Sequence, residues 1–151
     1  MIGHLFPFGM YGHYSVNGYR IVSNIIYSNT NHFLNLMSND ISVEFNSGYF
    51  LQANGNITII SSYISENGED VLIGSGELSI DSSIIWNNNG TAVNFNGLKN
   101  ISGLTYLTTN SGYGIDGSGD IYLDFVHIEE NSLGGINASG NISASGTDFN
   151  D

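Results

Sequence analysis

The sequence predicts an all-β fold, a right-handed single-stranded parallel β-helix built from about six coils of about 21 residues. Three observations lead to this prediction. Glycines recur at a nearly constant interval, short β-type segments repeat between them, and Ala, Lys and Glu, from which solvated helices are built, are scarce. The recurring glycines, 21 or 22 residues apart, are Gly55, Gly76, Gly97, Gly119 and Gly140.

The first β-type segment of each coil follows one of these glycines. Apolar and polar residues alternate in it, which is typical of a strand with one buried face. We assign this segment to residues 57–59, 78–80, 101–103, 121–123 and 142–144.

A second segment follows at residues 63–65, 84–86, 106–108 and 127–129, always with Ile or Leu in the middle. A third follows at residues 34–36, 71–73, 93–95, 115–116 and 136–138. An asparagine lies between the second and third segments, and Asn110 comes one residue earlier than its equivalents Asn31, Asn67, Asn88 and Asn131. We expect superposed asparagines to form a hydrogen-bonded ladder along the axis.

Three short strands and three turns per coil resemble the pectate-lyase-like superfamily and its generic parallel β-helix repeats. The resemblance covers about residues 21–151 and implies the architecture. It leaves the activity open, because proteins of this shape include polysaccharide lyases and hydrolases, phage tailspikes, adhesins and purely structural modules.

Two regions are expected: an aromatic and glycine-rich N-terminal cap or docking segment at 1–20, and the β-helix with an incomplete last coil at 21–151. Ile41 and Ile57 are only 16 residues apart, which predicts a shortened second coil. The last coil stops about halfway round. The chain is then a fragment of a longer β-helix, a dimer, or a subunit whose missing half coil comes head-to-tail from another copy.

The charge balance excludes several partners. Fourteen acidic residues against two basic ones, Arg20 and Lys99, give a formal net charge of −12. Nucleic acid and anionic membrane surfaces are therefore excluded as electrostatic partners, and no apolar run is long enough for membrane insertion. A lyase of anionic uronates normally uses several Lys or Arg, and the outward positions show no carboxylate pair for a hydrolase. The residues thus do not predict an enzyme.

Two sets of aromatic residues are candidate contact sites. Outward positions of the second segment form a strip, which predicts lateral packing against another subunit or glycan binding by ring stacking. Its members are Tyr27, Tyr63, Trp86, Tyr106 and His127. The N-terminal set, which either caps the first coil or docks on a neighbouring subunit, is Phe6, Phe8, Tyr11 and Tyr14.

The remaining motifs are weak. Five sequons would suit a secreted glycoprotein, although their number is near chance and corner asparagines are the first interpretation. They lie at Asn56, Asn89, Asn100, Asn137 and Asn141. The glycine motif at 112–117 is a chance match, and Asp116 and Asp120 resemble the start of a calcium loop that lacks its final Glu. The four histidines show no ligand spacing, so no cofactor or metal is expected.

These observations predict a structural or adhesive module, either extracellular or on a cell or virion surface. Self-assembly head-to-tail into a rod or filament is the most specific form of this expectation. The alternative is a carbohydrate-binding or polysaccharide-degrading β-helix fragment.

Overall fold

The computed structural model describes residues 57–150 in full and, before them, the backbone of six short strands. All the described elements are β-strands, and none of the described residues forms a helix long and apolar enough to cross a membrane. The N-terminal strands are β1 (His13–Tyr14), β2 (Asn24–Tyr27), β3 (Phe33–Leu34), β4 (Met37–Asn39), β5 (Ile41–Glu44) and β6 (Leu51–Asn54). The others are β7 (Ile57–Ile60), β8 (Tyr63–Ser65), β9 (Leu72–Asp81), β10 (Ile84–Trp86), β11 (Val93–Thr108), β12 (Tyr113–Ser118), β13 (Ile121–Glu129), β14 (Gly134–Ser139), β15 (Ile142–Ser145) and β16 (Asp148–Asn150).

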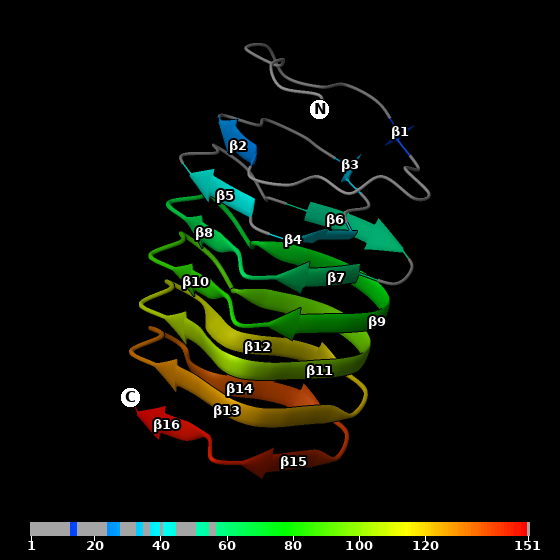
Figure 1. Ribbon diagram of the computed structural model, residues 1–151. Helices are drawn as coiled ribbons and strands as arrows, with labels where there is room; N and C mark the ends of the chain where they lie inside the picture. The colour runs from blue at the N-terminus through cyan, green and yellow to red at the C-terminus, as the bar shows by residue number, and fades with distance from the viewer. Residues whose placement is uncertain are drawn as a thin grey trace.

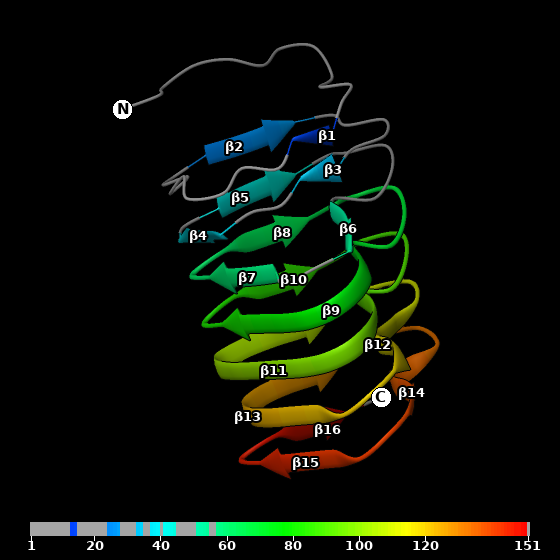
Figure 2. The same cartoon turned by 90° about the vertical axis from the view of Figure 1, so that its right-hand side faces the viewer.

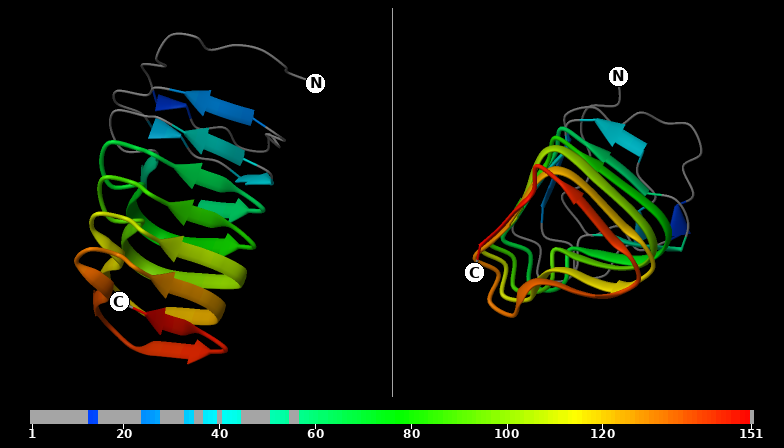
Figure 3. Two further views of the ribbon diagram at one scale, coloured as in Figure 1. Left: turned by 90° about the vertical axis from the view of Figure 1, so that its left-hand side faces the viewer. Right: turned by 90° about the horizontal axis from the view of Figure 1, so that it is seen from below.

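Over residues 57–150, the strands wind into a parallel β-solenoid of about four turns with a spacing of about 21 residues (Figures 1 and 2). The expectation of about six coils covered the longer range 21–151, where β2 and β5 continue the same stack on the second face. Seen along the axis, the coils superpose in a three-sided outline (Figure 3). The first face holds β7, the end of β9, the middle of β11, the start of β13, and β15. The second face holds β5, β8, β10, the ends of β11 and β13, and β16. The third face holds β6, the starts of β9 and β11, β12 and β14.

Alternating side chains make the core. Ile57 and Ile59 point inward from β7 and are almost fully buried, while Thr58 and Ile60 are only partly buried. Their register partners Leu78 and Ile80 continue the buried stack in the next coil. Burying each such side chain contributes about 1.5–3 kcal/mol, so the stacked interior is the main source of stability.

One coil has a different register from the one expected. Lys99, not Ile101, pairs with Leu78 above and Ile121 below, so the first strand of this coil begins two residues earlier. The strand was assigned from sequence on the assumption that inward residues are apolar. The assumption fails here, because a lysine occupies an inward position. An irregularity between Ser102 and Thr105 accommodates one extra residue and accounts for the 22-residue interval.

The expectation of a short coil between Ile41 and Ile57 is wrong. Ile41 begins β5, which pairs with β8 on the second face, whereas β7 on the first face pairs with β4. The two isoleucines therefore lie on different faces, and their spacing does not measure a coil. The shorter interval is the one between β2 and β5, in which Asn24 pairs with Ile41.

Polar side chains occupy two of the three corners. Between the second and third faces, the predicted asparagine ladder is confirmed, and its members are Asn67, Asn88, Asn110 and Asn131. Between the first and second faces, the backbone N–H of Ser62 donates to the Ser83 hydroxyl, and that of Ser83 donates to Thr105. Each hydrogen bond joins neighbouring coils.

Glycine occupies the third corner because no side chain fits. Gly97 has a φ of +130°, and a Cβ there would overlap the carbonyl oxygen of Gly76. The spacing of these glycines, from Gly76 onward, therefore reports a steric requirement that repeats with each coil.

Candidate functional site: the outer side of the second face

The outer side of the second face carries two columns of side chains, two residues apart along each strand. The residue between them points into the core, as Ile64, Ile85 and Ile128 do, each with no exposed surface. We call the first column the tyrosine column; it contains Tyr63, Ile84, Tyr106, His127 and Asp148. We call the second the tryptophan column; it contains Ser65, Trp86, Thr108, Glu129 and Asn150.

The predicted aromatic strip is divided between these columns. Tyr63, Tyr106 and His127 lie in the tyrosine column, and Trp86 lies in the neighbouring one. Tyr27 pairs with Glu44, which pairs with Ser65, so its register leads to the tryptophan column and not to the tyrosine column as expected. The side chain of Tyr27 lies outside the described residues.

The rings contact one another along the axis. Tyr63 and Trp86 have centroids 6.1 Å apart and planes tilted by 57°. Tyr106 and His127 stack with centroids 4.6 Å apart and planes 7° from parallel. Between these pairs, Ile84 is 36% exposed, so the outer side of the second face is partly apolar.

Trp86 is packed more closely than a free binding residue would be. Its indole Nε1 is buried and has no hydrogen-bond partner. A buried N–H without a partner costs free energy, so this ring is held by packing rather than by polar contacts. In this position, the N–H does not face solvent.

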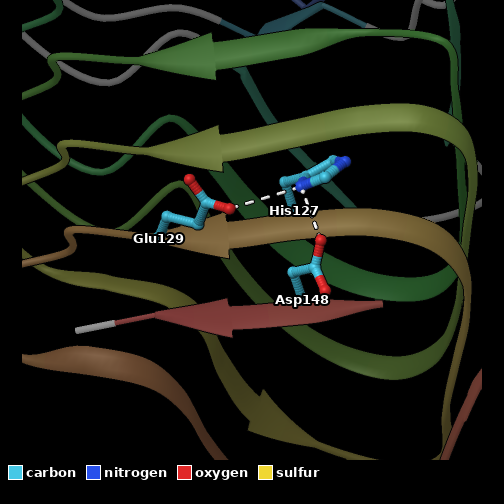
Figure 4. Close-up of side chains that lie close together, drawn as sticks. All are labelled: His127, Glu129 and Asp148. Atoms are coloured by element: carbon cyan, nitrogen blue, oxygen red, sulfur yellow. Dashed lines mark hydrogen bonds and ion pairs between the residues drawn. The ribbon is translucent and has the colours of Figure 1, made fainter. Parts of the chain in front are cut away.

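A mixed cluster of one histidine and two carboxylates lies at the C-terminal end of the columns (Figure 4). His127 Nδ1 is 3.3 Å from Glu129 Oε1 and 3.3 Å from Asp148 Oδ2. Glu129 is two residues along β13, on the same side of the strand, and Asp148 is the register partner of His127 in β16. Among the described residues, this is the one group of three or more His, Cys, Asp or Glu side chains with ligand atoms within 4.8 Å of one another.

Sequence reasoning missed this cluster because it compared the histidines only with each other. The signal that would have found it is the coil spacing of 21 residues, which joins His127 to Asp148, together with the two-residue period that joins His127 to Glu129. Both spacings were available from the repeat.

The acidic residues of the supposed calcium loop are engaged in bonds between coils. Asp116 Oδ1 accepts hydrogen bonds from the backbone N–H of Gly117 and from Asn137 Nδ2. Asp120 Oδ1 accepts from both the backbone and the side chain of Asn141. These carboxylates thus bind asparagines of the next coil.

The candidate glycosylation residues differ in access. Asn89, Asn137 and Asn141 are exposed, and Asn100 is partly buried in β11. Asn56 lies outside the described residues, as do Phe6, Phe8 and Tyr11 of the N-terminal segment. Tyr14 is described only by its backbone in β1, which pairs with β3.

Lys99 is an unexpected polar group in the core. Its side chain is fully buried, and Nζ donates to the carbonyl oxygens of Gly97, at 2.9 Å, and Ser118, at 2.8 Å. Burial lowers the pKa of Lys99, and the charge of Asp120 partly offsets that shift. The lysine therefore joins the glycine corners of two neighbouring coils inside the solenoid.

The C-terminal end of the solenoid exposes two residues whose register partners in the preceding coil are buried. Ile142 is 49% exposed, whereas its register partner Ile121 is 1% exposed. Phe149 is likewise 49% exposed, whereas its partner Ile128 has no exposed surface. We call this surface, which also includes Ile136, the end face.

Comparison with known proteins adds no family to this geometry. No family model, no curated protein and no solved structure matches the chain. The structure therefore defines the class as a parallel β-solenoid.

Proposed function

We propose that this chain is a non-enzymatic structural or adhesive module that assembles head-to-tail into a rod or filament. The exposed end face is the observation that carries the proposal. Covering two side chains that are each half exposed, and whose equivalents in the preceding coil are buried, gains free energy through the hydrophobic effect. A further coil stacked on β15 and β16 would cover both.

The backbone of the end face supports the same proposal. In the described part of the chain, β15 and β16 each pair only with β13, so each has one edge without a partner strand. Open edges of this kind accept strands by parallel addition. The register of the added strands would follow the same spacing as inside the chain.

We propose the N-terminal region of a second copy as the occupant. Its aromatic segment, with Phe6, Phe8, Tyr11 and Tyr14, supplies apolar side chains that match the exposed Ile142 and Phe149. A contact between two different ends of the same chain is heterologous and propagates into an open filament. The formal net charge of −12 would oppose assembly at low salt and oppose it less at high salt.

A location outside the cell or on a cell or virion surface is part of this proposal. The many uncharged polar residues and the exposed sequons at Asn89, Asn137 and Asn141 support it. A relationship to the pectate-lyase-like superfamily is proposed on the three-strand coil and the asparagine ladder.

Sedimentation velocity over a range of protein concentrations, with negative-stain microscopy, tests the assembly. We expect association that grows with concentration, and we expect Ile142→Glu with Phe149→Glu to abolish it. Leu104→Glu is the matched control, because Leu104 is 58% exposed at a lateral corner and should leave assembly intact. Circular dichroism checks that each variant remains folded. A wild-type chain that stays monomeric at high concentration, or equal assembly of both variants, would overturn the proposal.

Carbohydrate binding is the second candidate, and the outward aromatic rings of the second face favour it. Sugar rings stack on aromatic side chains, and Tyr63 and Tyr106 are both partly exposed. A glycan array with the wild type and with Tyr63→Ala plus Trp86→Ala tests this function. Equal binding of the two proteins would exclude the second face as the site.

A further inference from the structure

We propose that His127, Glu129 and Asp148 bind one divalent transition-metal ion, with zinc as the reference metal. The three side chains come from two neighbouring coils and converge on one point outside the second face (Figure 4). The site uses neither Ile142 nor Phe149, the side chains on which the proposed assembly rests, although Asp148 and Phe149 belong to the same strand, β16.

The distances from His127 Nδ1 to the two carboxylate oxygens fit ligation of one metal ion better than one N–H donating to both oxygens. Both carboxylate oxygens lie 3.3 Å from the same nitrogen, Nδ1. A charge-assisted N–H···O bond is about 2.7–2.9 Å long, and one N–H cannot point well at two oxygens. A tetrahedral zinc with bonds of about 2.0–2.1 Å holds its ligand atoms about 3.3–3.4 Å apart. The two nitrogen–oxygen distances therefore match those between ligand atoms of one coordination shell, and all three ligand atoms lie within 4.8 Å of one another.

The donor set selects the kind of metal. Ca²⁺ and Mg²⁺ prefer oxygen ligands only, whereas an imidazole nitrogen suits Zn²⁺, Cu²⁺, Ni²⁺ and Fe²⁺. Two carboxylates with one imidazole would neutralise the two positive charges of the ion. Three protein ligands leave a fourth tetrahedral position for water.

The surrounding structure holds the histidine in place while leaving the site accessible. The imidazole stacks on Tyr106, which restricts its plane, and its side chain is 22% exposed. Asp148 is 62% exposed and Glu129 31% exposed, so an ion could reach the site from solvent. Little rearrangement of the backbone is needed, because β13 and β16 already hold the three residues in register.

Titration calorimetry of the untagged chain with ZnCl₂ tests the site. We expect one saturable Zn²⁺ per chain, and binding at least about tenfold weaker in His127→Gln and in Asp148→Asn, since even outer-shell partners contribute about 10–100-fold to metal affinity. Glu130→Gln is the matched control, because Glu130 is the adjacent exposed carboxylate and lies outside the cluster. This control should bind like the wild type. Circular dichroism confirms the fold of each variant.

Two further measurements separate ligation from a structural effect. Nitrogen-15 spectra of the imidazole should place the metal on Nδ1 and a proton on Nε2 of His127. CaCl₂ at the same concentration should not displace Zn²⁺. The proposal is overturned by a wild type without saturable Zn²⁺ binding, by ligand variants that bind as tightly as Glu130→Gln, or by displacement of Zn²⁺ by Ca²⁺.

Discussion

The side-chain amide of Asn88 donates a hydrogen bond of 2.8 Å to the amide oxygen of Asn110 in the next coil. The same oxygen accepts the backbone N–H of Asn88 at 3.1 Å, and Asn110 Nδ2 in turn donates to Asn131 at 2.9 Å. All three asparagines are buried. Each amide therefore satisfies polar groups of the coil on either side. The ladder adds side-chain hydrogen bonds at a corner where the backbone also joins the coils, as the N–H of Ser111 does by donating to the carbonyl oxygen of Asn88.

Replacing one amide should break this ladder. Asn110→Ala leaves two buried donors of Asn88 without this acceptor. It also removes the Nδ2 donor to Asn131 Oδ1 and to the carbonyl oxygen of Ile85, while the backbone N–H of residue 110 still donates to Asn131. Because each buried polar group without a partner costs about 1–3 kcal/mol, we expect the free energy of unfolding to fall by about 2–4 kcal/mol. Urea denaturation monitored by circular dichroism measures this loss in the free energy of unfolding.

Asn89→Ala is the control for this variant. Asn89 is exposed, and its amide makes one long hydrogen bond, 3.3 Å to the carbonyl oxygen of Gly68. We expect a change within about 0.5 kcal/mol. Equal losses in the two variants would mean that the ladder has no special role.

The repeat explains why the architecture could be predicted from sequence. Gly76, Gly97 and Asn88 each sit at a corner that only one kind of residue fills, so their spacing encodes the coil directly. The predicted register was wrong at a position that more than one kind of residue can fill. A lysine can fill an inward position when its ammonium reaches carbonyl oxygens, as Lys99 does, and apolarity alone then assigns the wrong residue.

The candidate site was predicted less completely for a related reason. The outward positions of Tyr63, Tyr106 and His127 follow from the two-residue period within a strand. The contact of His127 with Asp148 can be predicted only when the 21-residue period between coils is used as well. It joins a histidine to a carboxylate, and the sequence was searched for each of these residue types separately. The exposure of Phe149 depends on which strands cover it, and no local pattern encodes that.

Gly97→Ala should destabilise the solenoid through its backbone. The added Cβ would overlap the carbonyl oxygen of Gly76, and the φ of +130° is unfavourable for any side chain. We expect a loss of about 2–4 kcal/mol in the free energy of unfolding, measured by urea denaturation. Gly135→Ala should change it by less than about 0.5 kcal/mol, because its Cβ would meet only side-chain atoms at 3.5 Å and 3.7 Å. If Gly97→Ala left the free energy of unfolding unchanged, the steric explanation of the glycine spacing would be wrong.

Leu104→Asn should stabilise the chain. Leu104 is 58% exposed and has a φ of +59°, a left-handed conformation that costs an ordinary side chain about 1–2 kcal/mol. Asparagine tolerates this conformation, so we expect a gain of about 0.5–1 kcal/mol in thermal or urea unfolding. Leu133→Asn, at a residue equally exposed but without a positive φ, should give no gain. A loss of stability in Leu104→Asn would show that the leucine makes a favourable contact.

Lys99 should make the stability of the solenoid depend on pH. Burial lowers the pKa of its ammonium group in the folded state, and the charge of Asp120 raises it by a smaller amount. The unfolded chain therefore keeps this proton to a higher pH than the folded chain does, so the contribution of Lys99 to stability rises with pH between the lowered pKa and about 10.4. Other groups also titrate in that range, and Lys99→Met removes only the lysine, so the difference between the two proteins isolates its effect. We expect the free energy of unfolding of the wild type to increase relative to that of Lys99→Met as the pH is raised from neutral to 10. Urea denaturation at several pH values measures this difference. A difference that stays constant would show that the lysine keeps its ordinary pKa inside the core, and a difference that falls would show that folding raises the pKa.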